Sequence, residues 1–290
     1  MLVNLPHLDQ KSIANLATKG LPRDNLQRQL DESLILSLEL WHAQGLEVVE
    51  QDGLYYYHTK FVRLEDAVFC IVDIETNGSS VDKHQIIELA AVKVQNGVIV
   101  DRFESLVECP FINQHITKIT GITAEETKDA PPLEDVLLNF KIFLGDAIFV
   151  AHDVKFDFRF ISQSMQRIGL EPLLNRTLCS LALAERTIES YRYALSYLND
   201  TFHLYPEATH HRAMSDVITT YKLFILSFTY LDWDIKTVEE LISFTKEAKK
   251  LKRPKVDPLA KEENEEVQME LLGKSTYAYK FFITRFHTLL

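Results

Sequence analysis

The chain has 290 residues, of which 46% are hydrophobic and 25% charged, as in ordinary soluble globular proteins. Its net charge of −11 argues against a protein that grips long duplex DNA by itself, because such proteins carry a basic surface. The three cysteines are far apart, with no CxxC pair. We therefore expect neither a disulfide framework nor a cysteine zinc site. We expect a cytoplasmic location. We expect neither a signal peptide nor a membrane span, since the apolar stretches are short.

Residues 1–65 are predicted to form a small separate module. Apolar residues between Leu30 and Trp41 recur every three or four positions, as on one face of a helix. Two short strand-like runs then flank Asp52-Gly53, which is a strong hairpin signal. Helices followed by a hairpin predict a winged-helix-like module, and a protein-docking appendage has equal weight.

Residues 66–230 are predicted to form one α/β domain. The pattern indicates strands in 67–75 and 147–152, and two more in 85–109 that turn at Asn96-Gly97. Predicted helices occupy 131–145, 154–169, 178–188, 194–202 and 211–231. Three strands, a crossover helix and a fourth strand predict a mixed sheet with helices on its faces. This segment holds 22 acidic and 14 basic side chains, and so −8 of the net charge.

Residues 231–290 differ from the preceding domain. A helix is predicted in 237–251, and 249–266 changes from basic to acidic around two prolines, as a linker does. Residues 277–290 are again aromatic and aliphatic. We expect this terminal segment to fold back onto the core or to dock on a partner.

An acidic pair ends the first strand of the α/β domain, in "FCIVDIETNG" (69–78). Side chains alternate along a strand, so Asp73 and Glu75 point to the same face. They lie at the carboxyl end of the strand, where α/β sheets build their sites. Such a pair also occurs by chance at strand ends, so it does not identify a site alone.

Two further segments contain candidate site residues. In "AHDVKFDFRFI" (151–161), Asp157 lies in the first turn of a helix, where an acid also interacts favourably with the helix dipole. In "HHRAMSD" (210–216), His211 and Asp216 are five residues apart, about 140° around a helix axis. His211 is therefore expected on the loop that enters the helix, with Asp216 in its first turns. The neighbouring His210 is expected on the surface.

Together these residues suggest a metal site. The carboxylates of Asp73, Glu75, Asp157 and Asp216 offer oxygen ligands, which suit Mg²⁺ or Mn²⁺ rather than zinc. Two such ions about 4 Å apart can clamp an in-line phosphoryl transfer. Histidine is the side chain that titrates near neutral pH, so His211 is a candidate for the base that deprotonates the attacking water.

The three segments resemble the motifs of the DEDDh family of 3′–5′ exonucleases, and the resemblance covers roughly residues 66–226. It is strongest to the proofreading (epsilon) subunits of bacterial DNA polymerase III. The spacing of His211 and Asp216 selects the histidine branch, since the tyrosine branch would have Tyr where this chain has Arg212. The resemblance implies an RNase H-like fold with a mixed five-stranded sheet flanked by helices.

The resemblance also implies roles for individual residues. Asp73, Glu75 and Asp216 would hold the first metal, Asp73 would bridge to the second, and Asp157 would act partly through water, with His211 as general base. The residues implied to contact the terminal nucleotide are Thr76, Asn77, Gly78, Ile119 and Phe156. The family often has Asn where this chain has Asp153, which adds an acid near the site.

The sequence thus predicts a metal-dependent 3′–5′ exonuclease that releases nucleoside 5′-monophosphates from single-stranded or frayed DNA 3′ ends. The expected role is proofreading beside a bacterial DNA polymerase catalytic subunit, which would supply the grip on duplex DNA. One alternative is an RNA-directed exonuclease of the same family. Another is a regulatory protein that binds DNA or protein through residues 1–65 and retains only a residual exonuclease fold.

Overall fold

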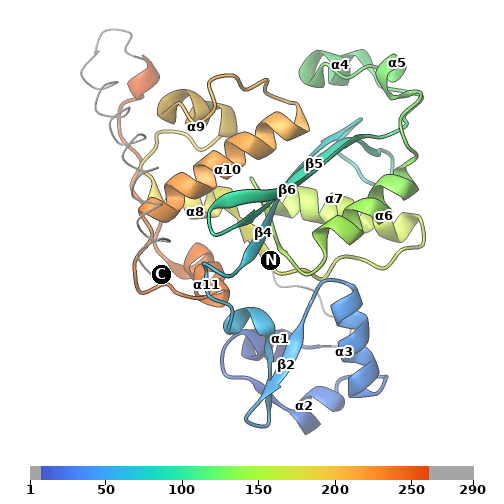
Figure 1. Cartoon of the computed structure of the whole chain (residues 1–290). Coiled ribbons are helices and arrows are strands. Elements are labelled where there is room, and N and C mark those ends of the chain that lie inside the picture. Colours follow the sequence, from blue (N-terminus) through green and yellow to red (C-terminus); the bar gives the residue numbers. More distant parts are fainter. Residues whose placement is uncertain (1–7, 261–290) are drawn as a thin grey trace.

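A five-stranded sheet forms the centre of the molecule, in a computed structural model that describes residues 8–260 (Figure 1). Its strands are β4 (Val68–Thr76), β5 (Ile86–Gln95), β6 (Val98–Leu106), β7 (Ile148–Ala151) and β8 (Thr177–Cys179). Their order across the sheet is β6-β5-β4-β7-β8. The first three strands pair antiparallel, whereas β7 and β8 run parallel to β4. The predicted mixed five-stranded sheet is confirmed.

Turn residues fix the antiparallel half of this sheet. Asn96 and Gly97 join β5 to β6, and both have positive φ angles, 47° and 74°. A two-residue hairpin turn of this kind favours Asn-Gly, because Asn and Gly tolerate a left-handed backbone. The predicted hairpin is therefore present at the predicted position.

Helices cover both faces of the sheet. The elements on and beside it are α4 (Gln114–Thr120), α5 (Ala124–Thr127), α6 (Leu133–Leu144), α7 (Val154–Arg167), α8 (Ser180–Thr187), α9 (Leu195–Phe202), α10 (Ala213–Thr229) and α11 (Val238–Glu247). Along β4, Phe69 and Ile71 pack against α10 and α11, whereas Cys70 and Val72 pack against α6 and α7. The strand is buried on both sides, so its apolar residues are nearly continuous.

The shortest strand of the sheet was not predicted. The sequence pattern assigned 178–188 to one helix, but Thr177–Cys179 pair with β7 as strand β8 and α8 begins only at Ser180. Three residues are too few to show an alternating pattern. The strand is stabilised by the neighbouring β7, a tertiary contact that local periodicity does not contain.

The N-terminal residues fold into the predicted helices and hairpin. The elements are α1 (Gln10–Ala17), β1 (Leu21–Pro22), α2 (Arg23–Gln27), α3 (Leu34–Ala43), β2 (Val48–Gln51), β3 (Leu54–Tyr57) and the 3₁₀ turn η1 (His58–Lys60). The three strands form a separate sheet in the order β1-β3-β2. Asp52 and Gly53 form the hairpin turn with φ angles of 52° and 78°. Helices and hairpin follow one another as a winged-helix-like module requires.

This module packs tightly against the larger domain. Leu174 joins the module's apolar core, and its N–H donates to the Gln44 carbonyl at 2.9 Å. Nearby, Arg176 and Glu239 form a buried two-pronged ion pair with N–O distances of 2.6 and 2.5 Å. Thr59 donates to the same carboxylate at 2.6 Å. The module is therefore anchored by an apolar contact and by a buried charged network.

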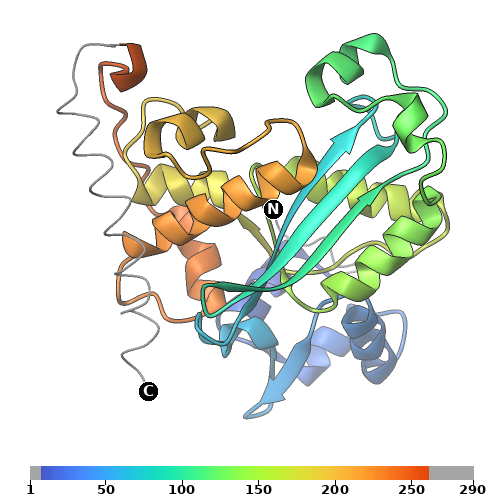
Figure 2. The same cartoon turned by 45° about the horizontal axis from the view of Figure 1, so that its top comes forward.

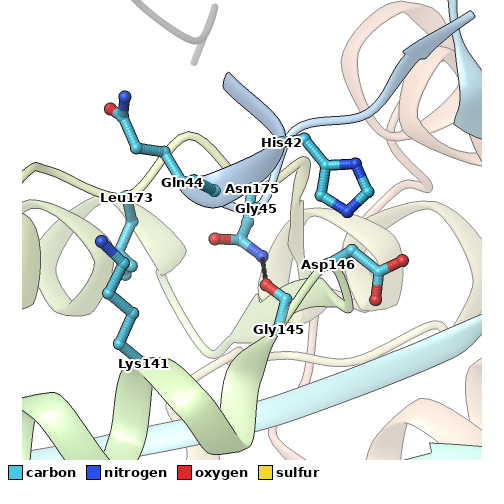
Figure 3. Close-up of a pocket in the computed structure, with 9 residues that line it drawn as sticks. His42, Gln44, Gly45, Lys141, Gly145, Asp146, Leu173 and Asn175 are labelled. Carbon is cyan, nitrogen blue, oxygen red and sulfur yellow. Dashed lines mark hydrogen bonds between the residues drawn. The ribbon is translucent and has the colours of Figure 1, made fainter. Parts of the chain in front are cut away.

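The side-chain amide of Asn175 lies at the junction between the N-terminal module and the larger domain (Figure 3). Asn175 donates to the carbonyls of Gly145 at 2.8 Å and Ala147 at 3.0 Å. Gly45 has a φ of 89°, and a Cβ atom at this position would lie 2.3 Å from the Asn175 oxygen. A cavity of about 270 Å³ remains between the two parts. Its lining includes His42, Gln44, Lys141, Asp146 and Leu173.

The described part of the C-terminal region joins the main core. Val238, Leu241 and Ile242 of α11 are buried against the sheet. A 3₁₀ turn, η2 (Pro258–Ala260), ends the described residues, and the predicted apolar segment 277–290 lies outside them. Among residues 8–260, no helix combines the length and apolar character needed to cross a membrane.

Candidate active site

The acidic pair of β4 lies at the end of the sheet that faces away from the N-terminal module (Figures 1 and 2). Asp73 and Glu75 continue the side of β4 that Phe69 and Ile71 occupy, which is the α10 face. Both are half-buried. The pairing with β5 shifts register just after Glu75, and such irregularities often occur next to active sites.

Asp157 approaches this pair from the opposite helical layer. It lies in the first turn of α7 and is only 5% exposed. Burial raises its pKa to about 7, although hydrogen bonds from the backbone of Asp157 itself and of Ile74 act to lower it. The bond to Ile74 places the carboxylate against β4, beside Asp73.

Helix α10 brings the remaining acid and the histidine. Asp216 lies in its first turn, and His211 lies on the loop before it, as predicted from their spacing. The His211 N–H donates to the Asp216 carboxylate at 3.1 Å. Side-chain ligand atoms of Glu75, His211 and Asp216 all lie within 4.8 Å of one another. His210 is half-buried rather than on the surface, and its Nδ1 is 3.7 Å from Asp216.

The charges of the neighbouring acids act on Asp73 and Glu75. The pKa of Asp73 is raised well above its ordinary value, first by burial and then by the charges of Asp157, Asp216 and Glu75. Burial and the Asp216 charge raise the pKa of Glu75 to about 8. Burial also raises the pKa of Asp216, although the histidine loop opposes that shift. Each of these carboxylates therefore favours binding a proton or a cation.

The donor set fits divalent cations. Asp73, Glu75, Asp157 and Asp216 offer only carboxylate oxygens, which Mg²⁺ and Mn²⁺ prefer. The raised pKa values show that protons or cations must offset the clustered charge. Since His211 is exposed at the edge of this cluster, it can reach a water molecule as well as a carboxylate.

An ion pair between the buried Glu88 and the partly exposed Arg212, which the sequence did not reveal, supports the histidine loop. Glu88 of β5 lies directly opposite Glu75 and is only 2% exposed. Its oxygens bind the Arg212 guanidinium, at 2.8 Å from Nη2 and 3.2 Å from Nε. The Ala213 N–H donates to the same carboxylate at 2.8 Å. The sequence carries no local signal for this contact, because 124 residues separate Glu88 from Arg212.

The turn after Glu75 has a fixed shape. The Thr76 hydroxyl donates to the Gly78 carbonyl at 2.9 Å, and the side-chain oxygen of Asn77 accepts the Gln85 N–H at 2.8 Å. The Asn77 amide also donates to the Phe111 carbonyl at 3.3 Å, and the Phe111 side chain is 73% exposed. The turn is thus held in place by side chains that bind the protein itself.

The two apolar residues expected near the substrate differ in exposure. Ile119 is 41% exposed near the end of α4, whereas Phe156 is half-buried and packs on Phe160 with ring centroids 5.6 Å apart. Ile119 therefore has a free apolar surface. Phe156 has a smaller one.

Two residues of the second motif have structural explanations. His152 binds the Tyr193 carbonyl at 2.8 Å and the Ser180 hydroxyl at 3.1 Å, and burial lowers its pKa. Asp153 has a left-handed backbone, with a φ of 70°, before the first residue of α7. Asn and Asp tolerate this conformation better than other residues with side chains, so either can occupy the position. The Asp153 charge also raises the pKa of Asp157.

Comparisons with known proteins agree with this geometry. The family model described as "Exonuclease" matches residues 70–224, more than half of the chain. A PolC-type DNA polymerase III of Staphylococcus aureus (strain bovine RF122 / ET3-1) is 40% identical over 194 residues, which are 64% of this chain. A second Staphylococcus aureus polymerase of this type is 40% identical over 191 residues, 62% of this chain. The match spans only 13% of each polymerase's length.

Among solved structures, exonuclease X in complex with 5′ overhanging duplex DNA has a TM-score of 0.49 and 28% sequence identity. The likeness covers 61% of this chain and 99% of that one. The family match includes all the segments from which the acids and the histidine come. The chain therefore belongs to the exonuclease family, as an enzyme of the DEDDh-type 3′–5′ exonucleases.

Proposed function

We propose that this protein is a metal-dependent exonuclease that hydrolyses the terminal phosphodiester of single-stranded or frayed DNA 3′ ends and releases nucleoside 5′-monophosphates. The observation that carries this proposal is the convergence of four acids from β4, α7 and α10 beside His211. Their raised pKa values are typical of functional sites.

Asp73, Glu75, Asp157 and Asp216 would hold two divalent cations. When bound, these ions would offset the charge of the phosphodiester and of the attacking and leaving oxygens. Each carboxylate would then remain ionised, despite burial, at neutral pH. Asp73 is the best placed to serve both ions, because its pKa responds to the charges of all three other acids.

His211 would accept the proton of the attacking water. It is exposed, and its ring lies within reach of Glu75 and Asp216. The carboxylates keep a proton acceptor of this kind oriented, and an exposed position lets it pass the proton to solvent. His210 contacts Asp216 on the opposite oxygen, so it is less well placed for this role.

The terminal nucleotide would lie against the turn Thr76–Gly78, with Ile119 and Phe156 packing on its base. Contacts to a base face tolerate every sequence, which suits an enzyme that must remove any nucleotide. The chain's acidic surface favours a short single-stranded end over a long duplex. Similarity to PolC-type polymerases, and a neighbour solved with overhanging DNA, support DNA as the substrate.

Proofreading in the bacterial cytoplasm, at the replicating nucleoid, is the role we infer. In this proposal, 66–230 is the exonuclease domain, and 1–65 and 231–290 serve docking on a polymerase catalytic subunit. Helix α3 supports docking of protein rather than reading of DNA. It contains no Lys or Arg, and it exposes Ile35, Leu36 and Leu40. DNA-binding surfaces are basic, and exposed apolar surface is commoner at protein contacts.

Digestion of a 3′-mismatched DNA primer tests the proposal. With Mg²⁺ or Mn²⁺ we expect stepwise release of nucleoside 5′-monophosphates, and with EDTA none. Asp157→Ala should abolish turnover yet keep the fold, because losing one acid reduces repulsion in the metal-free site. The exposed acid Asp82 offers a matched control, since Asp82→Ala should leave turnover unchanged.

Other outcomes identify the alternatives. Faster digestion of a matched RNA strand would make the enzyme RNA-directed. Binding of duplex DNA without any digestion would favour the regulatory protein with a residual exonuclease fold. Full turnover by Asp157→Ala would contradict the site assignment.

A further inference from the structure

We infer that the Glu88–Arg212 ion pair is a positioning device for His211, the base in the proposed function on which this inference rests. Neither residue belongs to the acidic cluster or to the substrate turn. Arg212 directly follows His211 in the chain, and Glu88 lies on β5, which pairs with β4 and β6 inside the sheet. The pair thus links the histidine loop to the most buried part of the sheet.

The histidine loop needs such a support because its backbone is unusual. His211 has a φ of 62°, in the left-handed region that residues with side chains rarely adopt. Conformations of this kind persist only where the surrounding contacts determine them. The contacts that hold this loop are the bond from the His211 N–H to Asp216 and the bonds from Arg212 and the Ala213 N–H to Glu88.

The geometry of the pair explains why an arginine is present. Both Glu88 oxygens are used, since Nε lies 3.2 and 3.3 Å from them and Nη2 is 2.8 Å from one. A guanidinium fork fixes a direction as well as a charge, whereas a lysine ammonium acts as a point charge. The Ala213 N–H, at 2.8 Å, adds a third bond at the first residue of α10.

The pair also offsets the negative charge of Glu88, which raises the pKa values of Asp73 and Glu75. Glu88 faces Glu75 across β4 and β5, and like charges directly opposite are destabilising. With both oxygens bound to Arg212 and Ala213, Glu88 has no oxygen free to turn toward the site. Arg212 in turn offsets part of the charge near Glu75. Glu88 is therefore a support of the loop rather than a ligand.

A double-mutant cycle with His211 tests this inference. Arg212→Lys keeps the charge and loses the fork, and Glu88→Gln keeps the shape and loses the charge. We expect each change to lower kcat by about 10- to 100-fold on a single-stranded DNA oligonucleotide, with KM little altered. In a His211→Ala background, whose own kcat is lower, neither change should reduce kcat further.

Three measurements separate positioning from a general loss of structure. Thermal unfolding should show that the variants remain folded, and Mn²⁺ binding followed by calorimetry should be retained in Arg212→Lys. Hydrogen exchange in the peptide around His211 and Ala213 should become faster. Arg102→Lys, at an exposed arginine of β6, is the matched control and should change none of these.

The outcomes are distinct. An equal loss of kcat in the wild-type and His211→Ala backgrounds would overturn the inference. Full activity of Arg212→Lys would overturn it as well. Both results would leave the proposed function intact. A wild-type chain that releases no nucleotides under any metal condition would overturn both.

Discussion

Asp157 shows how a single residue links stability to pH. Its pKa in the folded chain is about 7, against 3.8 for an ordinary aspartate, and that of Glu75 is about 8 against 4.5. Between about pH 4 and pH 8 these two groups therefore bind more protons in the metal-free folded protein than in the unfolded chain. Their contribution to the free energy of unfolding falls as the pH rises through that range.

We predict that the metal-free protein melts at a lower temperature at pH 8 than at pH 5.5. Mn²⁺ should reverse the trend, because cations bind the ionised acids. Asp157→Asn should raise the free energy of unfolding in EDTA at pH 8 by roughly 1–4 kcal/mol, the equivalent of up to about three pKa units. Melting curves in EDTA and in Mn²⁺ measure both effects.

Asp82→Asn is the control for this experiment, since Asp82 is exposed. It should leave the melting temperature unchanged at both pH values. A metal-free melting temperature that does not depend on pH between 5.5 and 8 would show that the four acids do not repel one another as the geometry requires.

Individual residues differ in how far the sequence predicted them. Asp73 and Glu75 were predictable because strand alternation is local, and His211 because its spacing from Asp216 does not fit one helix face. Glu88 could not be found, because an acid inside an apolar strand has no visible partner until the fold brings Arg212 to it.

At the scale of elements, long periodic segments and turn residues were predictable. The hairpin at Asn96-Gly97 and the helix that ends at Gly145 have strong local signals. Leu178 and Cys179 of strand β8 were wrongly assigned to a helix, since the three residues of β8 form a strand only because β7 lies beside them. Short elements depend on neighbours far away in sequence, which single-sequence patterns cannot supply.

The element α11 leads to a prediction about the junction. Its Glu239 is 7% exposed and binds Arg176, which is 5% exposed and also lies over the Tyr57 ring at 4.4 Å. Glu239→Gln leaves the Arg176 charge buried without its partner. We expect a loss of about 3–5 kcal/mol in the free energy of unfolding, measured by chemical denaturation.

Replacing both partners provides the comparison. Arg176→Met with Glu239→Leu removes the charges together and should recover much of the lost stability. The exposed Glu247 of the same helix is the control, and Glu247→Gln should change stability by less than about 0.5 kcal/mol. If Glu239→Gln proved as mild as the control, the buried network would not be what anchors the module.

At the scale of the whole molecule, charge and distance set the expected mode of binding. The acids of β4 lie at one end of the sheet and the N-terminal module at the other (Figure 1). Asp73 and Glu75 lie five and seven residues after Val68, the first residue of β4, or about 17 and 23 Å along the strand. The acids and the module therefore lie toward opposite ends of this strand.

We predict a weak salt dependence for digestion of short single-stranded DNA. A chain with a net charge of −11 can neutralise few phosphates, so kcat/KM should fall much less between 50 and 200 mM salt than the 10³- to 10⁵-fold typical of proteins with six to ten phosphate contacts. Steady-state kinetics over that range measure the slope. A steep slope would show that a basic surface outside residues 8–260, or a different binding mode, holds the strand.

The closeness of Gly45 to Asn175 has a mechanical consequence. A side chain at residue 45 would collide with the amide that ties the turn before β7, and the left-handed backbone there would be strained as well. The N-terminal module is therefore held in a fixed orientation against the α/β domain. If a polymerase docks on α3, as proposed, it would hold the exonuclease domain in a fixed orientation, and the frayed DNA end would have to move to the active site.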